Sequence, residues 1–544
     1  MRDSKCSNRL TRRVGVALLA LLLMSGCAPN PVLEPPEIDV TALSVTQLRS
    51  QLASGELSAK TLVSAYLDRI ARIDDTAPKL NAIIEINPDA LEIAAELDRR
   101  LKASGPVGPL HGLPVLLKAN IDTADAMTTT AGSLALAHHY AARDAFVVQR
   151  LRAAGAVILA KTNLSEWANF RDDKSSSGWS SLGGQTRNPH VLDRNPCGSS
   201  SGSAAAVAAS LAPLAVGTET NGSIVCPAAY NGIVGIKPTV GTVSRQGIIP
   251  ISHSQDTAGP MAQTVAGAAL LLESMIGVDA ADAAAVAYPE GARSLLPDAG
   301  IQRLAGTRIG VLRTYYGQGE NPAVEAIFQT SVETLAELGA TLVDPIDYRR
   351  DDAQRQAGYQ VLLYEFKAGL NSYLESHSVG DGVDSLADLI VFNEAYEERA
   401  MPHFGQSIFH AAQAKGGLQE ADYIDARAAS IDRLRSDVDA LFAEQELDAL
   451  VIPVNGPAWK TDWLSGDNYA FGGTAYLAAV TGYPSIVVPA GAIRGLPIAV
   501  GFVGRAFAER EIIQLAYVFE QATNARISPQ FIATLEAEPS PEAD

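Results

Sequence analysis

Two serines in glycine-rich segments and one lysine are the residues of this chain whose types and spacing could do chemistry. Ser199 lies in a Gly-Ser-Ser-Ser-Gly segment, and Ser223 follows Asn-Gly. Glycine beside serine allows tight or left-handed turns, so a hydroxyl can project while neighbouring N–H groups converge on one point. Lys118 directly follows the apolar run LPVLL. Together these residues predict a serine nucleophile assisted by a general base.

Lys118 can act as a base only when its amine is neutral. Burial disfavours the charged form of a lysine and so lowers its pKa. The run LPVLL before Lys118 is short, apolar and preceded by a glycine, which is typical of a buried strand. A single lysine in such a place is more often snorkelling or ion-paired. Its combination with the two serines is what favours the base.

A histidine-assisted serine is the competing interpretation. The letters GSSSG at 198–202 match G-x-S-x-G, which would make Ser200 a nucleophile on a strand-to-helix turn. That turn needs a preceding strand, but residues 190–196 are polar and end in proline. None of the histidines downstream lies in a suggestive turn, so a histidine-based triad has little support.

The elements that must position these residues alternate between helix and strand. Apolar periodicity predicts helices after the capping residues Ser44 and Ser58, the first ended by Gly55. Further helices are expected at 88–103, 143–154, 200–211 and over much of 320–445, with strands at 113–117, 156–160, 213–217, 449–453, 485–489 and 497–503. This rhythm predicts an α/β fold, a large mixed, mostly parallel central sheet covered by helices on both faces.

Composition excludes several classes of protein. The chain has 544 residues, of which 47% are hydrophobic and 19% charged, as in a protein with a large core. The formal net charge is −19, which repels phosphate backbones. We therefore expect no nucleic-acid partner.

The N-terminus is predicted to be a targeting signal. A basic segment precedes an apolar run at 14–24 that is too short to span a bilayer. It ends in Met24-Ser-Gly-Cys27, which resembles the lipobox of bacterial lipoproteins, with Met24 in place of the usual leucine. We expect residues 1–26 to be a lipoprotein-type signal peptide and Cys27 to be lipidated. Ordinary secretion and an uncleaved anchor are the alternatives.

This signal sets the expected organisation and location. Residues 27–43 are expected to form a proline-rich tether, 44–530 a single domain and 531–544 an acidic tail. The predicted protein is exported to the cell envelope, on the periplasmic side or outer membrane of a Gram-negative cell. It would be a monomer that touches the membrane only through Cys27.

Apart from Cys6 in the predicted signal peptide and Cys27, the chain has two cysteines, and two do not make a disulfide scaffold. Cys197 and Cys226 each lie within three residues of one of the two serines. If the serines meet in space, the thiols could be close, but two buried free thiols are the expected state.

Six segments together resemble the amidase signature family, in its order and spacing, with 24 positions between Ser199 and Ser223. The strong likeness covers 108–265, and weaker family-like features lie at 481–504. Glu219 and Cys226 stand where much of the family has aspartate and arginine, a choice that looks most like bacterial peptide amidases. The segments are 108–123, 160–171, 183–189, 196–209, 217–245 and 249–261.

The resemblance implies a role for each residue of a Ser-Ser-Lys triad. Ser223 would be the nucleophile, Ser199 the bridging serine that follows a cis peptide bond, and Lys118 the base. The N–H groups of Thr220, Asn221 and Gly222, with Ser223 itself, would stabilise the oxyanion. No metal and no organic cofactor are implied.

Four other polar residues in these segments have structural interpretations. Asn221 replaces the first of two glycines that many members have, and asparagine tolerates left-handed geometry, so the turn can survive. Asp256, Arg245 and Lys161 lie in family-like stretches, and we expect them to be structural ion-pair or capping residues.

The sequence thus predicts a serine amidohydrolase that converts linear carboxamides, plausibly C-terminal peptide amides, to carboxylate and ammonia through an acyl-enzyme. Its partner would be a small-molecule or peptide amide. A binding lipoprotein without catalysis is one alternative, but it has no need of the three residues. A glutaminase-type component of an amidotransferase is another, and the signal peptide argues against it.

Overall fold

The computed structural model describes residues 38–289, 294–313, 321–346, 348, 351–377, 382–468 and 474–536. The predicted signal peptide, Cys27 and most of the tether lie outside these residues. From Asp39 onward the described chain forms one compact unit. Within the described ranges, no helix has the length and apolar character needed to cross a membrane.

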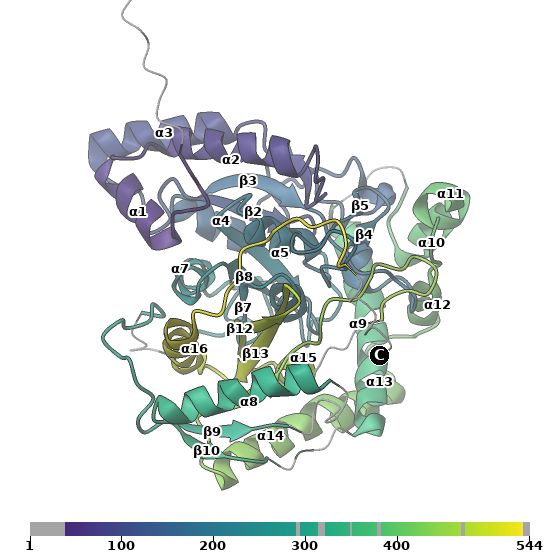
Figure 1. The fold of residues 1–544 in the computed structure, drawn as a ribbon. Helices are drawn as coiled ribbons and strands as arrows, with labels where there is room; N and C mark the ends of the chain where they lie inside the picture. Colours follow the sequence, from purple (N-terminus) through teal and green to yellow (C-terminus); the bar gives the residue numbers. More distant parts are fainter. Residues whose placement is uncertain are drawn as a thin grey trace, which may run out of the picture. The chain divides into compact units, whose positions relative to one another are not determined.

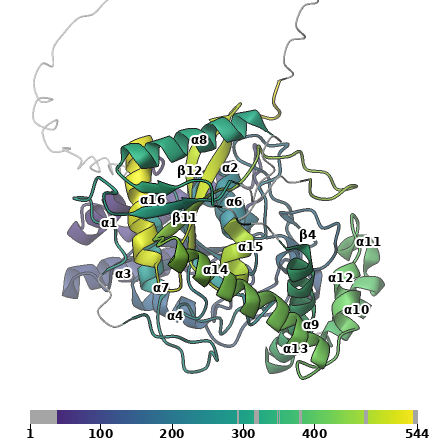
Figure 2. The same cartoon turned by 90° about the horizontal axis from the view of Figure 1, so that it is seen from below.

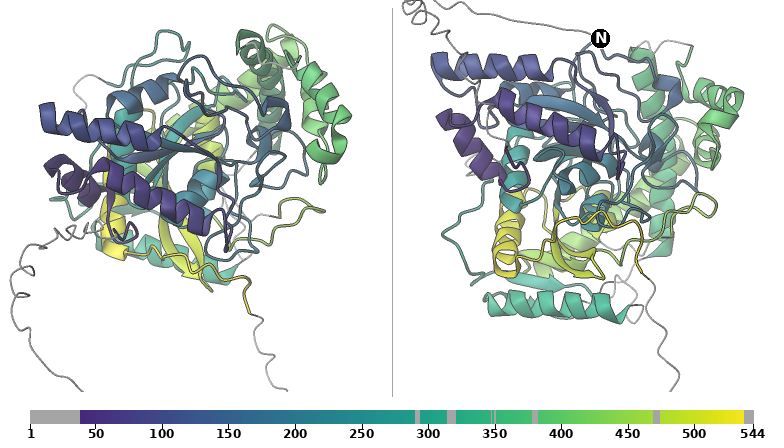
Figure 3. Two further views of the ribbon diagram at one scale, coloured as in Figure 1. Left: turned by 90° about the horizontal axis from the view of Figure 1, so that it is seen from above. Right: turned by 45° about the horizontal axis from the view of Figure 1, so that its top comes forward.

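The first two helices begin where their predicted capping residues lie. Helix α1 (Val45–Ser54) has Ser44 in a capping box and ends at Gly55 with φ 74°. Ser58 caps α2 (Ala59–Ile73) by accepting from the Thr61 N–H. Helix α3 (Ala90–Ser104) packs along α2, and the two lie side by side in Figures 1 and 3. In α1 and α2 a serine oxygen satisfies N–H groups that the first turn leaves unpaired, which fixes where each begins, whereas Asp89 before α3 makes no side-chain cap.

An eleven-stranded mixed sheet forms the centre of the unit, in the order β1-β3-β2-β6-β8-β7-β12-β13-β11-β9-β10. The large mixed α/β sheet is as predicted, although six of its ten described strand pairings are antiparallel and four are parallel. Parallel pairing lies in two blocks, β3-β2-β6 and β11-β9-β10, and the strands between and beside them pair antiparallel. The strands are β1 (Ile83–Ile86), β2 (Pro114–Lys118), β3 (Val157–Thr162), β6 (Leu214–Glu219), β7 (Val234–Lys237), β8 (Thr257–Ala262), β9 (Arg308–Val311), β10 (Thr341–Val343), β11 (Ala449–Pro453), β12 (Ser485–Ile493) and β13 (Leu496–Val503). A separate small hairpin joins β4 (Trp179–Ser180) to β5 (Gly184–Gln185).

Helices cover both faces of the sheet, as predicted, and Figure 2 shows the strands between them. One face carries α5 (Ser201–Ala208), α6 (Val225–Tyr230), α15 (Thr474–Thr481) and, outside α15, α14 (Arg433–Glu444). The other carries α7 (Val265–Met275), α8 (Pro322–Glu337) and α16 (Glu509–Thr523), with α1 and α4 (Phe146–Ala153) packed on α7. Strands covered on both sides read as continuous apolar runs, and every residue of β2, β3 and β6 is buried.

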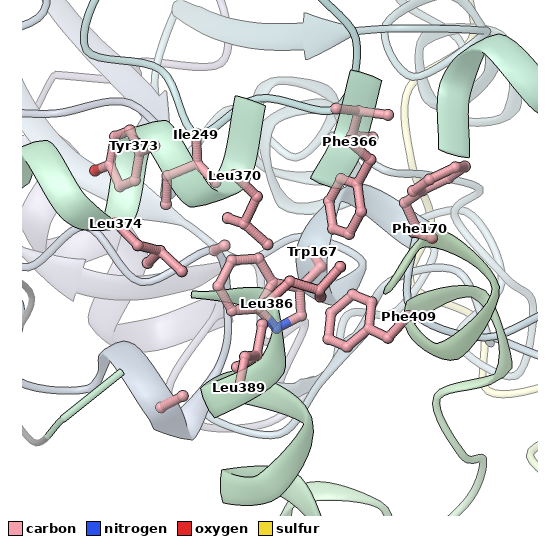
Figure 4. Packing of buried hydrophobic residues seen from close by; sticks show 14 of the residues in the cluster. Trp167, Phe170, Ile249, Phe366, Leu370, Tyr373, Leu374, Leu386, Leu389 and Phe409 are labelled. Atoms are coloured by element: carbon pink, nitrogen blue, oxygen red, sulfur yellow. The ribbon is translucent and has the colours of Figure 1, made fainter. Parts of the chain in front are cut away.

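The region 320–445 is mainly helical, as predicted. Its helices α9 to α13 gather beside the loops that follow β3, as Figures 1 and 2 show. They pack there through a buried apolar cluster that joins α9, α10 and α12 to Trp167 and Phe170 (Figure 4). The helices are α9 (Asp352–His377), α10 (Leu386–Ala395), α11 (Glu397–Ala400), α12 (Ser407–Gln413) and α13 (Ala421–Arg427), followed by the π-helical turn η3 (Ala428–Asp432). The loops that face these helices contain two short turns, η1 (Leu134–Leu136) and η2 (Glu166–Asn169).

The start of the predicted tail contacts the domain. Phe531 donates its N–H to the Pro189 carbonyl, and Ile532 forms a bridge with Val191. Residues 537–544 lie outside the described ones.

Candidate active site

The edge formed by the carboxyl ends of β2, β3 and β6 carries the site. These three strands are parallel, and Leu117 pairs with Lys161 on one side and Val216 on the other. Residues that follow the three strands therefore meet at one edge, as side chains do at ligand sites of α/β sheets. Lys118 ends β2 there, and Thr218 lies beside it on β6.

Lys118 is fully buried and hydrogen-bonded to two hydroxyls. Its Nζ lies 2.7 Å from Ser199 Oγ and 2.8 Å from Thr218 Oγ1, with a weaker contact of 3.3 Å to the Thr218 carbonyl. Asn120 donates its side-chain N–H to the same Thr218 hydroxyl, at 3.0 Å. The amine is therefore held in one position, facing Ser199.

Burial lowers the pKa of the Lys118 ammonium to about 7. The charges of Asp256 and Glu219 oppose this shift but do not overcome it. Removing an ammonium from water without a carboxylate in contact disfavours its protonated form. At neutral pH a large fraction of Lys118 is thus a neutral amine, the state that can take a proton.

Ser199 follows a cis peptide bond from Gly198 and is fully buried. The next residue, Ser200, donates its N–H to the Ser223 carbonyl at 3.1 Å, so the segment that carries Ser199 lies against the one that carries Ser223. The Ser200 hydroxyl instead donates to the Thr218 carbonyl. Ser200 therefore holds two strand-end segments together, and the G-x-S-x-G alternative gains nothing from the structure.

Ser223 lies in the loop between β6 and α6. Within the described chain, no hydrogen bond uses the backbone N–H groups of Thr220, Asn221, Gly222 or Ser223. Four neighbouring unpaired donors are what an oxyanion site needs. The left-handed residue of the loop is Gly222, with φ 91°, and Asn221 is not left-handed. The asparagine therefore imposes no strain on this turn.

Glu219 ties this loop to the helix that follows it. Its Oε2 accepts the N–H groups of Ile224, at 2.8 Å, and Val225, at 3.0 Å. The carboxylate thereby satisfies donors at the start of α6 that the helix itself leaves unpaired. Glu219 thus fixes the position of the residue next to Ser223.

Asp256 and Arg245 make structural contacts. Asp256 accepts the Thr220 hydroxyl at 2.5 Å and the N–H groups of Ile251 and Ser252 at 2.8 Å, and burial raises its pKa to about 6. Arg245 pairs with Asp282 rather than with Asp256. These are the capping and ion-pair contacts that the sequence indicates.

Cys197 and Cys226 form a disulfide, with 6.0 Å between their Cα atoms. The expectation of two free thiols is therefore wrong. The sequence allowed the thiols to be close only if the two serines met, and the fold does bring the Ser199 segment onto the Ser223 segment. The disulfide covalently links the residues that flank the cis peptide and the Ser223 loop.

Two adjoining cavities open at this edge. The first, of about 150 Å³, is lined by Ser223, the preceding loop and the disulfide, and across from them by Ala168, Asn169, Phe170, Ile251 and Leu362. None of the described residues that line it carries a formal charge. The second, of about 210 Å³, is lined by several charged or titratable side chains, those of Arg245, His253, Asp256, Asp282 and His377. They share Ala168, Thr220 and Ile251, so a neutral chamber at Ser223 adjoins a charged one.

Sequence reasoning missed two residues of this site. Thr218 contacts Lys118 only because β6 lies beside β2, a neighbourhood that no local pattern encodes. Asn169 lines the Ser223 cavity from a loop 54 residues upstream, and its only signal was membership of a family-like segment. Over the described ranges, no group of three or more His, Cys, Asp or Glu side chains is arranged to hold a metal ion.

Comparison with known proteins identifies the family of this chain. The model of the Amidase family matches residues 61–513. A probable amidase of Arabidopsis thaliana is 38% identical over 94% of this chain and 96% of its own. A glutamyl-tRNA(Gln) amidotransferase component of Symbiobacterium thermophilum is 36% identical over 88% of this chain and 97% of its own. Among solved structures, the native peptide amidase of Stenotrophomonas maltophilia is 47% identical, with a TM-score of 0.84 over 91% of this chain and 99% of its own.

Proposed function

We propose a reaction for this chain from the premise that it belongs to the amidase family, with a fold like that of a peptide amidase. It is an amidase, an enzyme that hydrolyses amides. The proposal is that Ser223, Ser199 and Lys118 carry this hydrolysis and that the substrate is a linear carboxamide, the C-terminal amide of a peptide. The contact of 2.7 Å between Lys118 Nζ and Ser199 Oγ, beside the Ser223 loop, is the observation that carries it.

The first half of the reaction forms an acyl-enzyme. Ser223 Oγ attacks the carboxamide carbon, its proton passes to Ser199, and the proton of Ser199 passes to neutral Lys118. The oxyanion that forms accepts hydrogen bonds from the unpaired N–H groups of the Ser223 loop. Lys118 returns the proton through Ser199 to the amide nitrogen, the C–N bond breaks, and ammonia leaves.

The second half reverses the roles. Water attacks the ester at Ser223 and gives its proton to the same relay. The C–O bond then breaks, the proton returns to Ser223 Oγ, and the carboxylate leaves. The neutral chamber suits an uncharged carboxamide, since the described residues that line it carry no charged side chain.

Ammonia release from a dipeptide amide tests this proposal. Ser223→Ala should abolish release, because no other group takes the place of the nucleophile. Ser203→Ala is the matched control: it removes a buried hydroxyl that contacts only the Thr162 hydroxyl and the Val216 carbonyl among the described residues, and it should retain most activity. Full activity of Ser223→Ala would exclude the mechanism.

A glutaminase activity is the second candidate, favoured by the likeness to a component of a glutamyl-tRNA(Gln) amidotransferase. It differs in substrate and not in the catalytic groups. Ammonia release from free glutamine, compared with release from a dipeptide amide under the same conditions, separates the two.

We also propose export and lipidation at Cys27. The disulfide supports an oxidising compartment, where such bonds persist. The intact mass of protein from the membrane fraction should include an acylated cysteine, and Cys27→Ser should move the protein to the soluble fraction. An unmodified Cys27 in membrane-bound protein would refute lipidation.

A further inference from the structure

The short turn η2 (Glu166–Asn169) holds three successive residues in the left-handed conformation. Trp167, Ala168 and Asn169 have φ values of 52°, 54° and 69°. The left-handed region is unfavourable for residues with a Cβ, and a run of them is rare. Such a conformation persists only where its surroundings impose it, and it concentrates at functional sites.

Contacts at both ends of η2 impose this conformation. Trp167 donates its N–H to the Ala131 carbonyl at 3.0 Å, and its ring packs among the apolar residues of α9, α10 and α12 (Figure 4). Glu166, the first residue of η2, and Arg171, which follows the turn, form a buried ion pair of 2.7 Å. Arg171 is held in turn by the carbonyls of Ala400 and Phe404. The fold thus fixes a costly turn from several sides.

This turn presents Ala168 and Asn169 to the cavity that contains Ser223. The side-chain oxygen of Asn169, Oδ1, is buried and accepts no hydrogen bond from any residue that the structure describes. Of the described residues that line this cavity, only Asn169 has a buried side-chain polar atom without a partner. A buried acceptor left without a donor is unfavourable, which points to a donor on the ligand.

A primary carboxamide brings one acceptor and two N–H donors into the cavity. The unpaired N–H groups at Ser223 can donate to the carbonyl oxygen of the carboxamide, so this oxygen has its hydrogen-bond donors. Its N–H donors need acceptors once water is excluded, since a buried polar group without a partner is costly. We infer that Asn169 Oδ1 accepts an N–H of the scissile carboxamide and so selects amides over esters at this site. This inference rests on the proposed function.

The competing explanation is that asparagine stands at 169 only because it tolerates the left-handed region. Glycine tolerates that region better still and has no side chain. Asn169→Gly therefore removes the acceptor while it keeps the turn. Asn524, which caps α16 with φ 44°, offers a matched control at an exposed position away from the site.

The test compares kcat/KM for an N-acylated dipeptide amide and for its methyl ester, which has no N–H at the scissile group. We expect Asn169→Gly to lower kcat/KM for the amide by about tenfold or more while the ester changes by less than about threefold. Asn524→Gly should leave the ratio of amide to ester unchanged.

An unchanged ratio in Asn169→Gly, whether both rates hold or both fall together, would overturn the inference. The failure of the triad is a separate result. It would appear as hydrolysis of the amide or the ester by Ser223→Ala, whatever happens at Asn169.

Discussion

Lys118 and Lys161 are two buried lysines at the ends of neighbouring strands, and only one faces a serine. Both are fully buried, and burial lowers the pKa of Lys118 to about 7 and that of Lys161 to about 8. Lys161 donates to the Ile121 carbonyl at 2.6 Å and the Thr129 hydroxyl at 3.1 Å. Lys118 donates to Ser199, whose segment lies against the nucleophile loop.

The comparison teaches that burial alone does not make a base. Each lysine donates a hydrogen bond to at least one hydroxyl group. The threonine beside Lys161, however, contacts no further reactive group among the residues that the structure describes. Asp122, Asp125, Glu85 and Asp144 also surround Lys161 and raise its pKa against the effect of burial. Lys161 thus ties the loop after β2 to β3, while Lys118 is placed to move a proton.

The largest effect should separate the two lysines directly. Lys118→Met keeps the length of the side chain without its amine and should lower kcat for peptide-amide hydrolysis on the order of 10³-fold, as expected for loss of a general base. Lys161→Met should change kcat by less than about tenfold and act mainly on stability, because it leaves the Ile121 carbonyl without its donor. Ammonia assays and thermal melting of both variants check this. Equal losses of activity in folded proteins would remove the distinction.

A smaller effect should separate the two hydroxyls that Lys118 contacts. Ser199→Ala breaks the proposed relay and should lower kcat on the order of 10²-fold. Thr218→Val removes the other hydroxyl and should cost about tenfold or less, since it disturbs only the position of Lys118. The two variants are assayed on the same amide. A Thr218→Val loss larger than that of Ser199→Ala would indicate that Ser199 is not in the proton path.

The pH profile should follow Lys118 and not Lys161. A base works when unprotonated, so activity is present above its pKa and lost as the pH falls through it. We expect kcat/KM to fall about tenfold per pH unit below an inflection near 7. The inflection should persist in Lys161→Met. An inflection near 8 that disappears in Lys161→Met would assign the profile to the other lysine.

The smallest effect on activity should come from loss of the disulfide. This bond links the segments around Ser199 and Ser223, which lie near Lys118 and not near Lys161. Cys197 and Cys226 are 29 residues apart, and loss of a link that closes such a loop lowers the free energy of unfolding by about 3.6 kcal/mol in the chain-entropy model. We expect Cys197→Ser/Cys226→Ser to show this loss in urea unfolding with a fall in kcat of only a few-fold. Unfolding midpoints that do not respond to dithiothreitol would contradict it.

Local patterns predicted the elements of this fold because their signals are local. Ser44, Gly55 and Ser58 mark helix ends through contacts within one turn, and the strand at 449–453 was placed at its observed bounds. The pairing between strands was harder. Antiparallel pairs such as β6 with β8 and β7 with β12 are set by long-range packing and not by the alternation of helix and strand along the chain.

The part of the candidate site that lies in recognisable sequence motifs was predicted. Lys118, Ser199 and Ser223 lie in segments that resemble a family, and the contact of Lys118 with Ser199 follows that resemblance. The bond between Cys197 and Cys226 and the roles of Thr218 and Asn169 depend on which distant segments meet. That is a property of the folded chain, and no spacing along the sequence encodes it.

Identification of the acylated residue tests the account most directly. The protein is mixed with an activated p-nitrophenyl ester of an N-acyl amino acid, quenched in acid within the first turnover and digested, and the acyl group is located by mass spectrometry. The account predicts the acyl group on Ser223 and none on protein that carries Ser223→Ala. An acyl group on Ser199 or Ser200 would contradict it.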